Sequence, residues 1–232
     1  MSIAENVQAV RERMKAAALA AGRDPGEVLL VAATKMNGAD RVREAIAAGV
    51  DVCGENRVQE LLEKNAQGAY AGAPLHFIGH LQKNKVRQIV GLAELIHGVD
   101  NLALLAVIDR CAAGKGLVQD VLLEVNVGGE ESKSGFAPEE VPAALEAASR
   151  FGSVRVRGLM AIPPICLSPE ENRPFFQKMK QLYVDNGEKK YDNVSMDFLS
   201  MGMSGDYTEA IACGANMVRV GTAIFGARDY SR

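Results

Sequence analysis

Eight short apolar segments recur along this 232-residue chain, and a helix-like segment follows each of them. The apolar segments occupy residues 28–34, 51–56, 75–79, 95–99, 121–127, 154–162, 197–202 and 216–221. Short continuous apolar runs are typical of strands that are covered on both faces, as in a parallel sheet. Eight strand–helix units therefore predict an α/β protein with a single (β/α)8 TIM-type barrel. An open doubly wound sheet is the alternative, and the lack of G-x-G-x-x-G after the first strand argues against it.

An amphipathic segment precedes the first predicted strand. Its apolar residues recur at helical spacing from Ile3 to Ala17, which predicts an extra N-terminal helix that ends near Gly22. No long Pro- or Ser-rich linker, low-complexity tract or change of composition interrupts the chain. Since α/β barrels commonly reach this length as one unit, we expect a single domain over residues 1–232.

Composition and charge argue against several classes of protein. The formal net charge of −3 gives no reason to expect an electrostatic nucleic-acid binder. The four cysteines are widely spaced and form no C-x-x-C motif, which favours reduced thiols. The N-terminus lacks the pattern of a signal peptide, and no apolar run approaches the roughly 18 residues that cross a membrane. We therefore expect a cytoplasmic monomer with no nucleic-acid or membrane partner.

Polar side chains collect where the predicted strands end, which in such barrels is where active sites lie. The residues at or just after these ends include Lys35, Glu55, Asn56, His80, Asn126, Met160, Ser200, Ser204, Arg219, Gly221 and Thr222. On the eighth strand, Val218 and Val220 suit the face toward the helices, so alternation places a paired Arg219 inside the barrel. Besides this lysine and arginine, we expect the rim to offer amides and hydroxyls, which do not titrate near neutrality.

Two glycine-bearing loops follow the seventh and eighth predicted strands. They have the sequences MSGD (203–206) and GTAIFG (221–226), and each leads into a short helix. Free backbone N–H groups at a helix start bind phosphate, and in barrels this pair of loops often does so. Ser204 and Thr222 add hydroxyl groups. Such pairs alone usually indicate turns, so their position after these two strands is what predicts an anion site.

A lysine and an anion site on one rim favour pyridoxal 5'-phosphate as the ligand. Its aldehyde forms a Schiff base with a lysine amine, and its phosphate needs hydrogen-bond donors. Lys35 is the candidate for attachment, and Arg219 is the candidate donor to the pyridine nitrogen. Because an arginine does not give up its proton, it would leave that nitrogen unprotonated and the cofactor a poor electron sink.

Several motifs carry a resemblance to a known family. They are TK (34–35), GENRVQE (54–60), HFIGHLQKNK (76–85), ESKSGF (131–136), RGLMAIPP (157–164), FLSMGMSGDYTEAIACGA (198–215) and VRVGTAIFG (218–226). In these stretches the sequence resembles the pyridoxal phosphate homeostasis proteins, the YggS/PROSC group, once called alanine racemase-like proteins. The resemblance covers nearly the whole chain. It implies a single-domain barrel of the fold shared with the N-terminal domain of alanine racemase.

The resemblance also implies roles for particular residues. It places the cofactor on Lys35, the phosphate at Ser204, Gly205, Gly221 and Thr222, the pyridine nitrogen at Arg219, and the rest of the cofactor near Asn56 and Met160. One departure is local, because Met36-Asn37-Gly38 replaces the more usual basic and Pro-containing segment after the lysine. We expect this departure to affect the entrance to the site and not the attachment.

Two classes of function fit these residues. The first is a carrier that buffers pyridoxal phosphate or delivers it to PLP-dependent apoenzymes, and the second is a weak PLP-dependent amino-acid racemase or related enzyme. Racemases of this fold add a β-rich domain and a tyrosine from a partner subunit, for which we expect no counterpart. None of Tyr70, Tyr183, Tyr191, Tyr207 and Tyr230 matches that tyrosine. His76, His80 and His97 form no metal-ligand motif, so we expect core or rim histidines, no metal, no catalytic residue and a carrier function.

Overall fold

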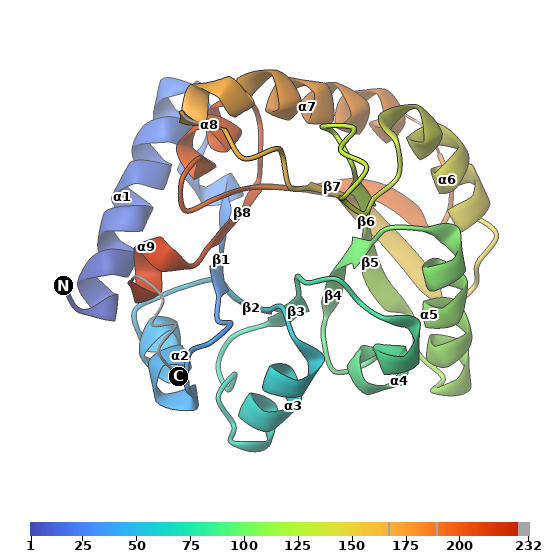
Figure 1. Cartoon of the computed structure of the whole chain (residues 1–232), viewed down its shortest axis with the longest axis horizontal. Coiled ribbons are helices and arrows are strands. Elements are labelled where there is room, and N and C mark those ends of the chain that lie inside the picture. The colour runs from blue at the N-terminus through green and yellow to red at the C-terminus, as the bar shows by residue number, and fades with distance from the viewer. Residues whose placement is uncertain (167, 189, 227–232) are drawn as a thin grey trace.

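A closed ring of eight strands forms the centre of the molecule (Figure 1). The computed structural model describes residues 1–166, 168–188 and 190–226. The strands are β1 Leu29–Ala33, β2 Val52–Glu55, β3 Leu75–Phe77, β4 Leu95–Val99, β5 Gln119–Val125, β6 Val154–Ala161, β7 Val194–Met203 and β8 Met217–Val220. Each strand pairs in parallel with the next, and β8 pairs with β1. The prediction of a (β/α)8 barrel is confirmed.

Helices surround the ring (Figure 1). They are α1 Ile3–Ala20, α2 Ala39–Ala47, α3 Val58–Ala66, α4 Val86–Ile89, α5 Leu102–Gly114, α6 Val141–Ala148, α7 Arg173–Gly187, α8 Tyr207–Ala212 and α9 Thr222–Phe225. Short 3-10 turns lie at η1 Pro25–Glu27, η2 Lys83–Lys85, η3 Pro138–Glu140 and η4 Pro169–Asn172. As predicted, α1 precedes the barrel, where it packs on α2, α8 and α9. No helix within the described ranges has the length and apolar character needed to cross a membrane.

The helix expected over residues 82–90 is shorter than its sequence pattern suggests. The structure gives this segment one 3-10 turn, η2, followed by a single α-helical turn, α4. Only Val86 and Ile89 of these two elements are buried, so few apolar contacts hold the segment against the barrel. Since most helical stability in proteins comes from packing an apolar face, the limited burial accounts for the short helix.

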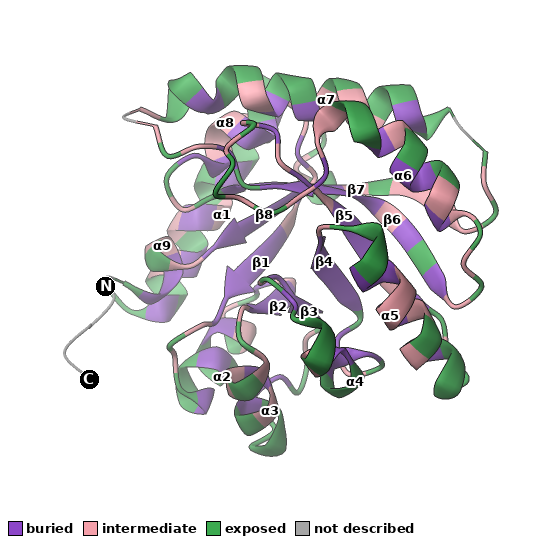
Figure 2. Cartoon of the chain, turned by 45° about the vertical axis from the view of Figure 1, so that its right-hand side comes forward, coloured by how far each residue is buried: buried purple, intermediate pink, exposed green. Residues whose placement is uncertain are grey.

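Two separate apolar regions result from the alternation of side chains along the strands. The larger region fills the space between the barrel and the helices, where strand residues such as Leu30, Ile96 and Val218 contact helical residues. The smaller region lies inside the barrel and includes Val31 and Leu122. Figure 2 shows the resulting pattern, with buried residues along the strands and exposed residues on the outer faces of the helices.

Charged side chains pair with one another at the end of the barrel where the strands begin. Asp120 accepts hydrogen bonds from Arg155 at 2.7 and 2.9 Å and from Arg157 at 2.6 Å. Arg157 also pairs with Asp197, and its guanidinium lies 5.3 Å from the centre of the Phe198 ring. The opposite charges at this end therefore compensate one another, and these side chains are committed to structure.

Gly158 allows β6 and β7 to approach each other closely. A Cβ atom at this position would lie 1.9 Å from the carbonyl oxygen of Phe198, and the φ angle of 142° disfavours any side chain. The pairing of the two strands shifts register between Val156 and Gly158. The glycine thus permits an irregular strand pair next to the barrel interior.

We expect Gly158→Ala to lower the free energy of unfolding by about 2 kcal/mol or more, because the methyl group would meet backbone. Urea denaturation measures this change. Gly152→Ala is the matched control, since a Cβ there meets no heavy atom within 4 Å, and we expect a change within about 0.5 kcal/mol. Equal losses in the two variants would contradict the role of the close approach.

Candidate functional site

Lys35 lies in a turn directly after β1, at the end of the barrel where the strands end. Val31 and Ala33, at the alternate positions before it, belong to the apolar region inside the barrel. The turn is closed by the N–H of Asn37, which donates to the carbonyl of Thr34 at 3.1 Å, and by the Asn37 side chain, which donates to the carbonyl of Lys35 at 3.0 Å. The lysine therefore leaves the barrel wall from a defined backbone position at its mouth.

The buried ammonium group of Lys64 stabilises the turn that carries Lys35. Lys64 of α3 is 6% exposed, and its Nζ donates to the carbonyl of Thr34 at 2.8 Å, to Glu55 Oε2 at 2.6 Å and to Glu60 Oε2 at 3.2 Å. These three acceptors match the three protons of the ammonium. Glu55 ends β2, as expected, and it is fully buried. Its carboxylate is needed to satisfy Lys64, because a buried ammonium requires acceptors.

The same cluster fixes the backbone on both sides of Lys35. On one side, the Thr34 hydroxyl donates to Glu55 Oε2 at 3.0 Å. On the other side, the backbone N–H of Met36 donates to Glu60 Oε2 at 2.7 Å. Met36 has a φ of 61°, which is unusual for a residue with a side chain. The ion cluster thus stabilises a backbone conformation that this sequence would not favour by itself.

Arg219 lies inside the barrel, as the alternation along β8 predicts. It is 4% exposed, and its Nη1 donates to Ser200 Oγ at 2.6 Å while its Nη2 donates to the carbonyl of Ala161 at 3.0 Å. Burial lowers the pKa of Arg219 to about 10, so the guanidinium is still protonated at neutral pH. Among the described residues, no carboxylate forms an ion pair with it. Its charge is thus held by two neutral acceptors.

The loops after β7 and β8 meet, as the anion-site prediction requires. Ser204 Oγ accepts hydrogen bonds from the backbone N–H groups of Gly221 at 3.1 Å and Ala223 at 3.3 Å. Gly205 and Thr222 follow these positions in the two loops and are exposed. A Cβ on Gly205 would meet no heavy atom within 4 Å, so space is open beside it. The structure therefore brings together backbone donors, two hydroxyl groups and open space.

A cavity of about 210 Å³ lies at the mouth of the barrel, and Asn56 and Met160 both line it. Asn56 follows β2, and its Oδ1 atom is buried without a hydrogen-bond partner. Buried polar atoms nearly always have partners, so an unpaired acceptor in a cavity wall indicates a donor from outside the chain. His80 and Lys133 line the same cavity.

Glu124 is a titratable residue of this cavity that the sequence analysis missed. It lies on β5, in register with Met160 of β6 and on the same face as Leu122. Burial raises the pKa of Glu124 to about 7, the charge of Asp100 raises it further, and the charge of Arg219 opposes the shift. The expectation of a rim without other titratable groups was therefore wrong. The alternation along β5 was the signal, because it places Glu124 inside the barrel.

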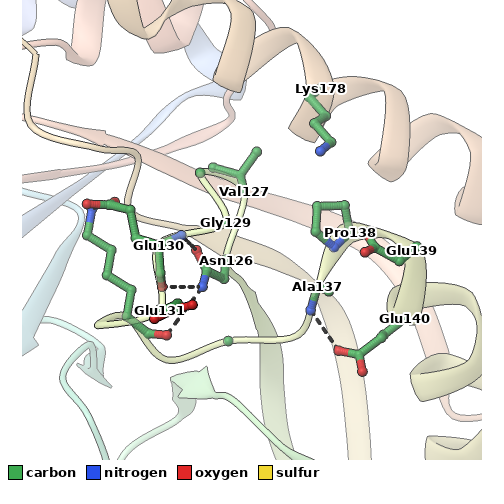
Figure 3. A pocket seen from close by; sticks show the side chains of 13 residues that line it. Asn126, Val127, Gly129, Glu130, Glu131, Ala137, Pro138, Glu139, Glu140 and Lys178 are labelled. Atoms are coloured by element: carbon green, nitrogen blue, oxygen red, sulfur yellow. Dashed lines mark hydrogen bonds and ion pairs between the residues drawn. The ribbon is translucent and has the colours of Figure 1, made fainter.

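Asn126 lines the mouth cavity, as expected for the rim, and also organises the loop after β5 (Figure 3). Its side-chain nitrogen donates to the carbonyls of Glu130 at 2.9 Å and Lys133 at 3.3 Å, and its Oδ1 accepts from the N–H of Glu130 at 3.2 Å. This loop positions Lys133, whose Nζ donates to the carbonyl of Pro163 at 3.0 Å. Asn126 therefore lines the cavity itself and also determines the shape of the adjoining loop.

The three histidines lie where they were expected. His76 and His97 are buried inside the barrel, and His80 lies at the rim, 3.3 Å from Asp100. In the described part of the chain, no group of His, Cys, Asp and Glu residues is arranged to hold a metal ion. The mouth of the barrel therefore combines the Lys35 amine, the two loops that meet at Ser204 and Gly221, the buried Arg219 and the carboxyl group of Glu124.

Comparisons with known proteins give the chain clear relatives. Residues 2–229 match the model of the family described as "Alanine racemase, N-terminal domain". The pyridoxal phosphate homeostasis protein of Aquifex aeolicus is 43% identical over 99% of this chain and 100% of its own length. The protein of the same name from Pseudomonas aeruginosa is 44% identical over 99% of this chain and 97% of its own length.

A solved relative shares the fold along its whole length. The structure of PipY from Synechococcus elongatus with PLP bound superposes with a TM-score of 0.83 at 33% identity. The match covers 97% of this chain and all of that chain, at 100%. The barrel and its mouth are thus shared with a protein whose structure contains the cofactor.

We expect Glu124→Gln to stabilise the protein at high pH and not at low pH. The pKa of Glu124 rises from 4.5 to about 7 on folding, so the folded state holds its proton more tightly and its stability falls as the pH rises through this range. At pH 8 the variant should be more stable than the parent by on the order of 1–3 kcal/mol, and near pH 4 the difference should vanish.

Urea denaturation of both proteins at several pH values measures this difference. Glu139→Gln, at an exposed position of η3, is the control and should show no such dependence. A Glu124→Gln variant that is less stable than the parent at pH 8 would contradict the buried, proton-binding carboxyl group.

Proposed function

Since the chain belongs to the alanine racemase N-terminal domain family and to the pyridoxal phosphate homeostasis proteins, we propose that it binds pyridoxal 5'-phosphate and serves in the homeostasis of this cofactor. Buffering the cofactor and delivering it to PLP-dependent apoenzymes are both part of this role. We further propose that the protein works in the cytoplasm as a monomer. The observation that carries the proposal is the clamped Lys35 at the mouth of the barrel, on the same rim as an anion cradle and a buried arginine.

The residues at the mouth fit the cofactor group by group. Ser204 and the N–H groups of Gly221 and Ala223 already form hydrogen bonds of the kind that a phosphate accepts, with Gly205 and Thr222 beside them. Arg219 offers N–H donors and a positive charge inside the barrel. The unpaired Asn56 Oδ1 and the side chain of Met160 line the adjoining cavity. Together these residues would provide hydrogen-bond partners for the phosphate and for the pyridine ring, and an apolar contact between these two parts of the ligand.

Pyridoxal phosphate supplies an aldehyde, with which a lysine amine forms a Schiff base. Lys35 would serve as that amine, and the Lys64 cluster would hold its backbone in place. Ser204 and Thr222 would bind and orient the phosphate. Arg219 would donate to the ring nitrogen without giving up its proton, because a guanidinium stays charged even with a pKa of about 10.

A carrier function fits the site better than an amino-acid racemase. The relatives are named for homeostasis of the cofactor, and their names assign no reaction. An arginine at the ring nitrogen would stabilise a carbanion poorly. Of the tyrosines considered as acid–base groups, Tyr70, Tyr183, Tyr191 and Tyr207 do not line the mouth cavity, and Tyr230 lies outside the described residues. Glu124 is the titratable group that a weak side reaction would use.

Borohydride reduction of the loaded protein, followed by peptide mapping, should place the cofactor on Lys35. Lys35→Ala should lose the visible absorbance of the bound cofactor while the barrel stays folded, because the amine lies in a surface turn. Lys83→Ala is the control, since Lys83 is exposed in η2, and it should bind as the parent does. An adduct found only on Lys83 or Lys85 would contradict the assignment.

Removing the Ser204 hydroxyl should weaken phosphate binding selectively. We expect Ser204→Ala to bind pyridoxal phosphate about tenfold to a hundredfold more weakly, because a hydrogen bond to a charged group contributes about 1.5–3 kcal/mol. Its affinity for pyridoxal, which lacks the phosphate, should change little. Ser195→Ala is the control, because Ser195 lies near the start of β7 and pairs with Asp197. Equal affinities of the parent protein for the two vitamers would argue against a phosphate site.

A further inference from the structure

Four polar side chains form a continuous hydrogen-bonded chain across the inside of the barrel. His76 Nδ1 lies 3.0 Å from His97 Nε2, and His97 Nδ1 lies 3.1 Å from Ser200 Oγ. Ser200 Oγ in turn accepts the 2.6 Å hydrogen bond from Arg219 Nη1. The chain runs from β3 and β4 to β7 and β8, on the other side of the ring (Figure 1). All four residues are buried, with exposed fractions of 7%, 0%, 0% and 4%.

The direction of this chain follows from the chemistry of its last member. A guanidinium can only donate, so Ser200 Oγ accepts from Arg219. Among the described residues, His97 Nδ1 is the one remaining side-chain partner of this hydroxyl, so the buried Ser200 proton is satisfied only if it is donated to His97 Nδ1. His97 then carries its proton on Nε2 and donates it to His76 Nδ1. His76 likewise carries its proton on Nε2. One donor-only residue therefore sets the tautomers of two histidines.

Burial keeps both histidines neutral, which this direction requires. Burial lowers the pKa of His76 to about 4, although the charge of Asp120 opposes the shift. Burial also lowers the pKa of His97 well below its ordinary value; a protonated His76 and the positive charge of Arg219 act in the same direction. At neutral pH each ring thus has one N–H and one free acceptor.

The chain provides Arg219 with a fixed acceptor that carries no charge. The His97 ring gives the buried Ser200 proton a partner, so the hydroxyl oxygen can accept from the arginine without leaving its own proton unsatisfied. With its proton committed to His97, the hydroxyl oxygen faces Nη1, while the carbonyl of Ala161 accepts from Nη2. Two acceptors on two nitrogens fix the plane of the guanidinium. Because neither is a carboxylate, the charge of the arginine stays available to a ligand.

Packing alone gives no reason for these residues. Two apolar side chains of similar size would fill the interior without burying four ring nitrogens and a hydroxyl group. The buried polar groups are paired along one line, and that line ends at Arg219. The hydrogen-bonded chain therefore supplies Arg219 with an acceptor, the hydroxyl oxygen of Ser200.

We propose that His97 and His76 are positioning residues that act through Ser200 to fix Arg219, so that the arginine presents a donor to the ring nitrogen of the bound cofactor. This inference rests on the proposed binding of pyridoxal phosphate. It adds two residues of the barrel interior that determine how the site recognises a pyridine ring.

The test compares two ligands, pyridoxal phosphate and its deaza analogue, in which C–H replaces the ring nitrogen. The parent protein should bind pyridoxal phosphate at least about tenfold more tightly than the analogue, because the analogue cannot accept from Arg219. In His97→Phe this ratio should fall to about one, with the affinity for the analogue changed by less than about threefold. His97→Asn should restore most of the ratio, because asparagine Oδ1 can accept from Ser200 where Nδ1 did.

A second measurement needs no ligand. Two-bond ¹H–¹⁵N correlation NMR of the protein without cofactor at pH 7 should show both histidines neutral with the proton on Nε2. Ser200→Ala should leave His97 without its fixed partner, so we expect mixed tautomers there and a loss of ligand discrimination like that of His97→Phe. If His97→Phe does not fold, Ser200→Ala replaces it in the comparison of the two ligands.

The outcomes separate the inference from the proposed function. A parent protein that binds neither ligand would overturn both. A parent that discriminates between the ligands, with His97→Phe and Ser200→Ala discriminating equally well, would overturn only the positioning role. A His97 found protonated, or with its proton on Nδ1, would overturn the direction of the chain and with it the role.

Discussion

The side chains inside this barrel are buried, and that burial governs which residue types lie there. Alternate residues of every strand point inward, so any polar group on the inner face needs a partner within the protein or from a ligand. Val31, Leu122 and Met217 meet this demand by being apolar. His97 and Arg219 meet it through hydrogen bonds. Asn56 Oδ1, at the mouth, has no hydrogen-bond partner among the described residues.

Charges are treated differently at the two ends of the barrel. Where the strands begin, Asp120 and Asp197 pair with two arginines. Where the strands end, Arg219 is held by neutral acceptors, and Glu124 is buried with a pKa of about 7. The ion pairs where the strands begin serve stability, whereas Arg219 and Glu124 influence each other's charge without forming a contact ion pair among the described residues.

The conformation of the turn that carries Lys35 depends on both its local sequence and its packing. Met36 adopts a left-handed conformation that costs an ordinary residue about 1 kcal/mol. The buried Lys64 cluster offsets that cost, because it bonds to the peptide groups on both sides of the lysine. The cluster thus keeps the turn, and with it the backbone of Lys35, in place.

Much of the architecture was predictable because it depends on local periodicity. Apolar runs identified the eight strands, and alternation along β8 placed Arg219 inside the barrel, since both patterns follow from the geometry of neighbouring residues. The same pattern along β5 would have revealed Glu124. The length of the helix after β3 was less predictable, because it depends on how many of its side chains pack against the barrel.

The sequence by itself determined the barrel, the rim on which Lys35 lies and the loops that carry Ser204 and Thr222. Only the tertiary structure decided that the carboxylate of Glu55 pairs with Lys64, and that His97 contacts Ser200, which lies 103 positions away in the sequence. The reason is that a strand's own pattern fixes which face a residue occupies. Its partner across the interior is fixed by the closure and register of all eight strands, and no short stretch of sequence contains that information.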